Sequence, residues 1–150
     1  MQGQGTADRG QGLRLPQTLY GEVIAHCLRH HPKEACGYLA GRADGVVQQV
    51  YPMTNVEDSS IGYSLDPKEQ LQVERAMRQR GQRMVAVYHS HTASDAYPSS
   101  VDVSLAISPD ISYVLVSLKD RARPVVRSFR IDGLQVAEEP VTVSPEPTRR

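Results

Sequence analysis

Two histidines and one aspartate are spaced so that their side chains can meet around a single metal ion. His89 ends a strand-like run at residues 84–89 and His91 follows two residues later, and alternate residues of a strand project to the same face. Asp102 follows eleven residues after His91, in the first turn of a helix expected from about residue 99. The intervening loop can fold this turn back over the strand end. Two imidazoles and one carboxylate are the protein ligands of many catalytic zinc sites, which keep a fourth position for water.

Each part of this pattern also has a simpler interpretation. A His-x-His pair is common on exposed strands, and Ser99 with Asp102 forms a helix-capping box. The interpretations are compatible, because Ser99 can cap the helix while Asp102 directs its carboxylate to the metal. His26 and His30 lie four residues apart on an expected helix, but no Glu follows the first of them as in HExxH. His30 and His31 fall at a helix C-terminus, which favours a partly positive side chain without any metal role.

The whole stretch resembles the signature of a known family. His-x-His, seven residues, then Ser-x-x-Asp is the pattern of the JAMM (MPN-plus) zinc metallopeptidases, and it matches without a gap at His89, His91, Ser99 and Asp102. The family also carries a Glu just ahead of an upstream strand, a place that Glu34 fills in HPKEACG. Alone, Glu34 would be a solvated charge at the start of a strand. Beside the complete motif, the resemblance implies that it is catalytic.

The resemblance extends over roughly residues 18–143. It includes the segments HPKEACGYLAG, YPMTN, YSLDPKEQL, YVLVSL and SFRI, which look like the compact bacterial branch of the family. It implies one catalytic zinc ion that activates water, with Glu34 as proton acceptor and donor and Ser99 as hydrogen-bond donor to the oxyanion. It also implies a partner, a small ubiquitin-like sulfur-carrier protein ending in Gly-Gly, from which cysteine would be released.

Three other functions stay open at this stage. A general deconjugase that frees ubiquitin-like modifiers from lysine would use the same atoms, so the motif does not distinguish it. A non-catalytic MPN scaffold that only binds partners would typically lack motif residues, whereas this chain has all five. A DNA-repair-associated branch usually reads HNHP, where this chain reads HSHT.

Composition narrows the class of protein further. The 150 residues fit one domain, and 17 basic residues balance 17 acidic ones, which argues against nucleic acid or anionic lipid as a partner. No run of 18 apolar residues predicts a membrane span, and residues 1–17 lack the apolar segment of a signal peptide, so we expect a cytoplasmic protein. Cys27 and Cys36 are expected as reduced, buried thiols. The sequence does not specify an oligomeric state.

Strands and helices are mixed without strict alternation, which predicts the α+β class. The resemblance implies a curved mixed β-sheet flanked by helices, the cytidine-deaminase-like arrangement. Residues 1–14 and 144–150 are expected to be flexible tails, leaving residues 15–143 as the JAMM/MPN-plus domain. Strands are expected at residues 35–40, 46–51, 61–65, 84–89, 111–118, 125–131 and 134–143.

Helices are expected at residues 16–31, 66–80 and 99–107. The second has the clearest start: Asp66 suits the N-cap, Pro67 the first helical position, and Glu69 the second half of a capping box. Gly81 is a suitable C-terminal stop. Asp132 and Gly133 predict a hairpin turn near the C-terminus.

Overall fold

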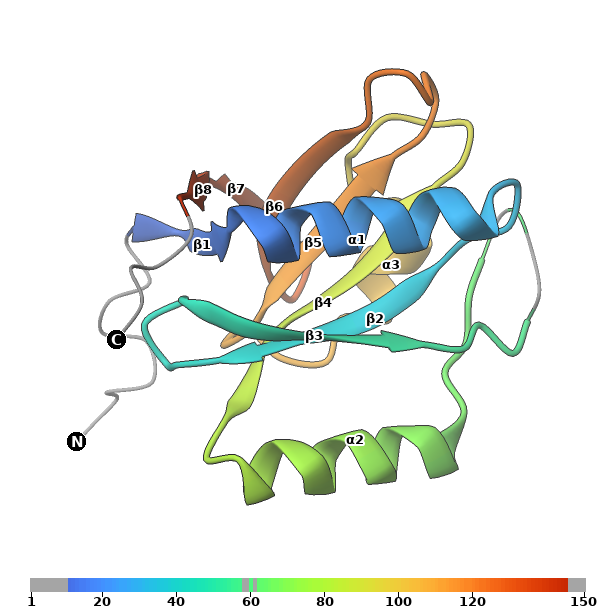
Figure 1. The fold of residues 1–150 in the computed structure, drawn as a ribbon. Helices are drawn as coiled ribbons and strands as arrows, with labels where there is room; N and C mark the ends of the chain where they lie inside the picture. The colour runs from blue at the N-terminus through green and yellow to red at the C-terminus, as the bar shows by residue number, and fades with distance from the viewer. Residues whose placement is uncertain (1–10, 58–59, 61, 146–150) are drawn as a thin grey trace.

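A mixed six-stranded sheet forms the centre of the molecule (Figure 1). The computed structural model describes residues 11–57, 60 and 62–145. The strands of this sheet are β2 (Cys36–Gly41), β3 (Val47–Met53), β4 (Arg83–His91), β5 (Ser112–Ser117), β6 (Val125–Asp132) and β7 (Gln135–Glu139). Their order is β3-β2-β4-β5-β6-β7, and only β4 and β5 run parallel. The α+β class is therefore confirmed.

Helices cover both faces of this sheet (Figure 1). They are α1 (Gln17–His30), α2 (Pro67–Gln79) and the short α3 (Ser100–Ser104). Val23 of α1 packs in the cluster that contains Leu39, whereas Met77 of α2 packs with Tyr38. Adjacent residues of a strand point to opposite faces, so α1 and α2 lie on opposite sides of the sheet. No helix among the described residues has the length and apolar character needed to cross a membrane.

The predicted flexible tails are wrong at their inner ends. β1 (Leu13–Pro16) pairs in parallel with β8 (Val141–Ser144), so residues 13 and 14 and Ser144 belong to strands. Leu13 and Leu15 are both 0% exposed and join the core beneath α1. The composition of residues 1–14 gave no sign of this pairing, because the partner strand β8 lies near the other end of the chain. Residues 1–10 and 146–150 lie outside the described part.

The start of α2 differs from its prediction in one contact. Asp66 caps the helix, since its side chain accepts a hydrogen bond from the backbone N–H of Lys68 at 3.1 Å, and Gly81 ends it with a φ of 67°. Glu69 does not complete a capping box. Its carboxylate instead accepts the backbone N–H of Thr54 at 2.8 Å, and so ties α2 to the end of β3.

Three further elements are shorter than or different from the prediction. Residues 62–65 form no strand, and their pairing is limited to one bridge between Asn55 and Leu65; residue 61 lies outside the described part. The predicted strand at residues 134–143 is divided by Pro140, which lacks the N–H that a strand ladder needs. α3 ends at Ser104, because the backbone N–H groups of residues 107 and 108 donate instead to the hydroxyl of Tyr113, both at 2.9 Å.

Candidate metal centre and active site

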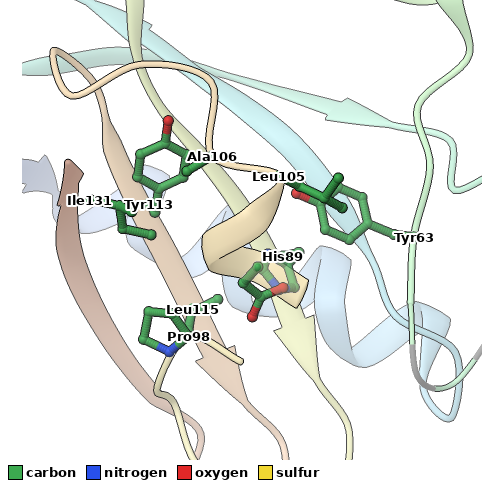
Figure 2. Close-up of a pocket in the computed structure, with 9 residues that line it drawn as sticks. Tyr63, His89, Pro98, Leu105, Ala106, Tyr113, Leu115 and Ile131 are labelled. Carbon is green, nitrogen blue, oxygen red and sulfur yellow. The ribbon is translucent and has the colours of Figure 1, made fainter. Parts of the chain in front are cut away.

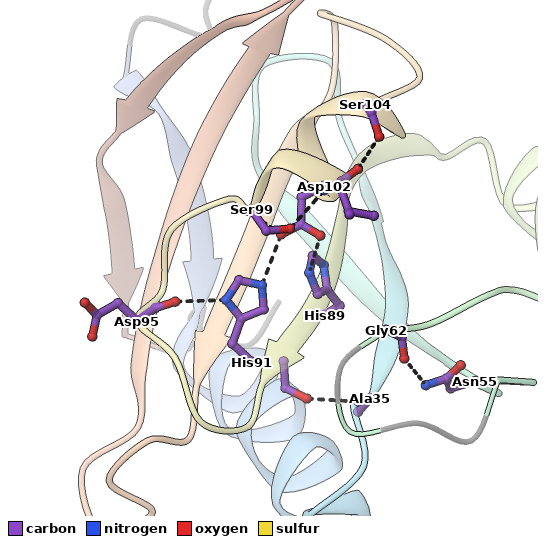
Figure 3. A network of polar contacts seen from close by, with 11 residues as sticks. Ala35, Asn55, Gly62, His89, His91, Asp95, Ser99, Asp102 and Ser104 are labelled. Atoms are coloured by element: carbon purple, nitrogen blue, oxygen red, sulfur yellow. Dashed lines mark hydrogen bonds and ion pairs between the residues drawn. The ribbon is translucent and has the colours of Figure 1, made fainter.

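The three predicted metal ligands meet at one point in the structure (Figure 3). His89 and His91 leave the end of β4 on the same face, and Asp102 lies in the first turn of α3. Nε2 of His89 lies 3.1 Å from Oδ1 of Asp102, and Nε2 of His91 lies 3.1 Å from Oδ2. All three ligand atoms lie within 4.8 Å of one another.

Two hydrogen bonds between Ser99 and Asp102 hold the Asp102 side chain in this position. The Oγ of Ser99 accepts the N–H of Asp102 at 3.1 Å, while Oδ2 of Asp102 accepts the N–H of Ser99 at 2.8 Å. This is the reciprocal capping box that the sequence indicates. The same carboxylate therefore both starts α3 and faces the two imidazoles, so the two interpretations of the Ser99–Asp102 spacing are compatible in the structure.

His91 is oriented through its second nitrogen. Its Nδ1 lies 2.8 Å from the carbonyl oxygen of Asp95, and since a carbonyl only accepts, Nδ1 carries the proton. This leaves Nε2 to face Asp102 and the ligand centre. A carbonyl bonded to the far nitrogen of a metal-binding histidine is a common means of fixing its tautomer.

The donor set fits a divalent cation of the zinc type. Nε2 of His89 is buried and lies 3.1 Å from Oδ1 of Asp102 without making a hydrogen bond to it, so a cation at this point would give the nitrogen a partner. The two imidazole nitrogens each lie 3.1 Å from one oxygen of the Asp102 carboxylate, so the three side chains face a common point. Two nitrogens and one carboxylate oxygen are the ligand types that zinc prefers.

The charges at this point depend on one another. Burial by itself would raise the pKa of Asp102, but the close contacts of its carboxylate with the His89 and His91 imidazoles hold it far below its usual range. Burial lowers the pKa of His89 and outweighs the effect of Asp102. Burial would also lower the pKa of His91, but its bonds to Asp102 and to the Asp95 carbonyl raise it above the usual value. The carboxylate is thus ionised and ready to bind a cation.

Glu34 is held beside this centre by the pairing of its neighbours. Its side chain is buried, with the residue only 7% exposed, and it immediately precedes the pairing of residue 35 with β4. The N–H of Ala35 donates to Oγ of Ser90 at 2.9 Å, and the N–H of Ser90 donates to the Ala35 carbonyl at 3.0 Å. Because Ser90 separates the two histidine ligands, this contact brings Glu34 to the metal end of β4.

Burial raises the pKa of Glu34 to about 7; His91 opposes this rise and the negative charge of Asp102 adds to it. A carboxyl group with a pKa near neutrality can take up and release a proton in the same reaction cycle.

An open cleft of about 600 Å³ is lined by most of the predicted site residues. Glu34, His91, Ser99 and Asp102 all line it, whereas His89 lines a smaller pocket that adjoins it. Every predicted site residue therefore lies in the walls of these two hollows. His26 does not: its Nδ1 lies 2.6 Å from the hydroxyl of Tyr88, in the interior beneath α1.

Sequence reasoning missed two residues that shape this site. The ring of Tyr63 packs on that of His89, with centroids 4.6 Å apart and planes 31° apart, and lines both hollows. Asn55 donates to the carbonyls of Glu34 and Gly62 and accepts the N–H groups of residues 57 and 64, each at 3.0 Å. It thereby fastens the segment that carries Tyr63 to the backbone of Glu34. Figure 3 shows the bond from Asn55 to Gly62. An Asn after a strand is a typical turn residue, and this was the only available signal.

A mixed sheet with a His-x-His strand end and an Asp at the start of the following helix defines a JAB-type metalloprotein domain. The family model described as prokaryotic homologs of the JAB domain matches residues 16–132, and the chain belongs to this family. The predicted family is thus confirmed, and the family together with the His-His-Asp cluster indicates a metal site.

Known proteins resemble the chain over most of its length. It is 50% identical to the CysO-cysteine peptidase of Mycobacterium tuberculosis over 132 residues, which cover 87% of this chain and 90% of that protein. It is 39% identical to the probable TtuB-protein conjugate cleaving protease of Thermus thermophilus over 98 residues, 65% of each chain.

Solved structures agree with the fold. A protein from Desulfitobacterium hafniense matches with a TM-score of 0.82 and 39% identity, covering 89% of this chain and 94% of that one. A JAB1/MPN domain protein from Archaeoglobus fulgidus, only 16% identical, matches with a TM-score of 0.59 over 90% of this chain and 100% of that one, and shows the same fold.

Proposed function

We propose that this protein is a zinc-dependent peptidase that cuts the bond after the terminal Gly-Gly of a small ubiquitin-like sulfur-carrier protein and releases cysteine. The observation that supports this proposal is the convergence of the His89, His91 and Asp102 ligand atoms at the edge of a cleft that His91, Asp102 and Glu34 line. The proposed substrate is supported by the 50% identity to a CysO-cysteine peptidase, which covers 87% of this chain and 90% of that protein.

The residues around the metal centre have separate roles in this reaction. His89, His91 and Asp102 would hold the zinc ion, which supplies Lewis-acid chemistry by polarising a carbonyl group and lowering the pKa of water. Glu34 would accept a proton from the attacking water on a carboxylate oxygen. It would then deliver this proton to the nitrogen of the departing amine as the carbon–nitrogen bond breaks. Its buried position and its pKa of about 7 suit both steps.

Ser99 would stabilise the negative charge that develops on the carbonyl oxygen. Its Oγ already accepts the N–H of Asp102, and the residue is exposed at the cleft, so its hydroxyl hydrogen is available to donate to a substrate oxygen. A donor aimed at the developing oxyanion is worth about 10²–10³ in rate.

A deconjugase acting on lysine isopeptides is the second candidate. The 39% identity to a probable TtuB-protein conjugate cleaving protease favours it, and the same residues would perform the chemistry. The two candidates differ only in the amine that leaves.

The deciding experiment supplies the protein with a carrier–cysteine adduct and with a carrier–lysine isopeptide, each with and without a chelator. Mass spectrometry of the products identifies the bond that is cut. We expect chelator-sensitive release of cysteine, and expect Glu34→Gln to keep its zinc but to lose about 10²–10⁴ in rate. Cleavage of the isopeptide alone would support the deconjugase. Cleavage of neither by zinc-loaded protein would refute both and favour a binding scaffold.

A further inference from the structure

A small second pocket lies beside the metal ligands, between the end of α3 and the sheet (Figure 2). We call it the inner pocket; its volume is about 30 Å³. The ligand side chains of His89 and Asp102 form part of its wall. It shares Tyr63, Leu105 and Asp102 with the large cleft, so the two hollows adjoin at the metal centre.

The inner pocket has the size of a very small side chain. A cavity needs about 10–15 Å³ on this measure to hold one water molecule, so 30 Å³ accommodates about two atoms of that size. A cysteine side chain has two heavy atoms, Cβ and Sγ. A lysine side chain has five and ends in a charge that is costly to bury.

Apart from the proposed ligand residues His89 and Asp102, the walls of the inner pocket carry no charged side chain and are suited to a neutral group. Ala106 and Leu105 close it from the side of α3, and Leu115 of β5 and Ile131 of β6 form its floor. No lysine or arginine lines it. A thiol behaves as a small apolar group with weak hydrogen-bonding capacity, and such walls would hold it without an ionic partner.

The proposed substrate determines which side chain can reach this place, so this inference rests on the proposed function. The two carrier residues before the cut bond are glycines and have no side chains. The next residue along is the one released, and its Cβ lies only two bonds from the amide nitrogen. With the cut bond at the metal centre, the side chain of the released residue is therefore the one that can enter a pocket walled by His89 and Asp102.

We propose that the inner pocket is the subsite for the side chain of the released residue and that it selects small, neutral residues such as cysteine. Tyr63 and Leu105 form the rim between this subsite and the cleft. Tyr63 is fixed there by its contact with His89, whereas Leu105 is 61% exposed and open to the approaching substrate.

The test compares released residues of increasing size on one carrier. Adducts with glycine, cysteine, leucine or lysine after the Gly-Gly, each joined through its α-amino group, are cleaved by the zinc-loaded protein, and kcat/KM is measured for each. We expect cysteine to exceed glycine, and leucine and lysine to fall at least tenfold below cysteine, because mismatch of a side chain with its pocket costs about 10–200-fold.

A variant that partly fills the inner pocket gives a sharper test of the proposed subsite. Ala106→Val adds two carbon atoms to the wall, and should lower kcat/KM for the cysteine adduct by about 10–100-fold. It should leave the glycine adduct within about threefold, since glycine places nothing in the pocket. Ala137→Val makes the same change on the exposed strand β7 and should alter neither substrate. The zinc content of each variant is measured alongside.

The outcomes separate this inference from the proposed function. Equal loss on the cysteine and glycine adducts in Ala106→Val, or no dependence of the native protein on residue size, would overturn the subsite and leave the peptidase in place. Failure of the native, zinc-loaded protein to cut any adduct would overturn the proposed function, and the subsite with it.

Discussion

Replacing Glu34 by Gln in the metal-free protein should make it more stable at alkaline pH. Glu34 is buried beside Asp102, and burial raises its pKa from 4.5 to about 7. In the folded protein, ionising this side chain is therefore unfavourable, whereas in the unfolded chain it ionises freely. The folding free energy gained with a neutral Glu34 begins to be lost near pH 4.5 and is fully lost just above pH 7.

The size of the effect follows from the shift. Each unit of pKa difference between the folded and unfolded states corresponds to about 1.4 kcal/mol, so the complete loss amounts to about 3 kcal/mol. Between pH 5 and pH 8 the change is about 2.5 kcal/mol, because the unfolded chain is already largely ionised at the lower value. A Gln side chain does not titrate, so Glu34→Gln removes this dependence on pH.

Urea unfolding in the presence of a chelator measures the effect directly. The difference in unfolding free energy between Glu34→Gln and the native protein should grow by about 2.5 kcal/mol from pH 5 to pH 8, in favour of the variant. With a slope of about 2 kcal/mol per molar urea, this is a change of about 1 M in the relative midpoints. Glu57→Gln is the matched control, an exposed acid that lines the same cleft. Parallel pH profiles of native protein and Glu34→Gln would refute the reasoning.

Three further substitutions test other parts of the site. Ser99→Ala should lower kcat by about 10²–10³-fold, whereas a residue that only caps α3 would lower Tm and leave turnover per folded molecule unchanged. Asp102→Asn should lose zinc on dialysis, and full occupancy by metal analysis would contradict its place among the ligands. Asn55→Ala removes four hydrogen bonds and should lower the unfolding free energy by about 3 kcal/mol and slow turnover. If fully folded Asn55→Ala protein turned over substrate at the native rate, the positions of Tyr63 and Glu34 would not depend on Asn55.

The cluster of His89, His91 and Asp102 could be predicted because two local rules place these side chains. Strand alternation puts His89 and His91 on one face, and the capping box directs Asp102 toward them. Both rules operate within a few residues, so spacing in the sequence carries the information. The helix around Asp102 has only five residues, yet its cap still fixes the carboxylate.

The residues around the His-His-Asp cluster are positioned by contacts between segments that are distant in the sequence. Such contacts could not be predicted from the sequence. Tyr63 reaches His89 because Asn55 bonds to the carbonyls of Glu34 and Gly62, and nothing in its own neighbourhood indicates this. Glu69 was expected to cap α2 but bonds to Thr54, fifteen residues away. In both cases a polar side chain has several backbone groups within reach, and only the assembled fold selects among them.

The errors at the two ends of the domain have the same cause. Residues 13 and 14 follow a stretch rich in Gln and Gly, whose composition is typical of disorder. Their partner β8 lies more than a hundred residues later, and the expected strand at residues 134–143 had joined it to β7 across Pro140. A parallel pair joined through almost the whole chain leaves no short-range pattern in either strand, so the pairing and the burial of Leu13 and Leu15 become visible only in the assembled fold.

Two buried polar groups of the site lower the stability of the metal-free protein. A buried carboxyl group with a raised pKa and an orphaned buried imidazole nitrogen both lower the stability of the metal-free fold. Both lie where a cation would relieve them, since positive charge favours ionised Glu34 and gives Nε2 of His89 a partner. Features that are costly alone and compatible together are characteristic of sites organised for chemistry. The metal centre, Glu34 and the cleft are therefore best understood as one unit.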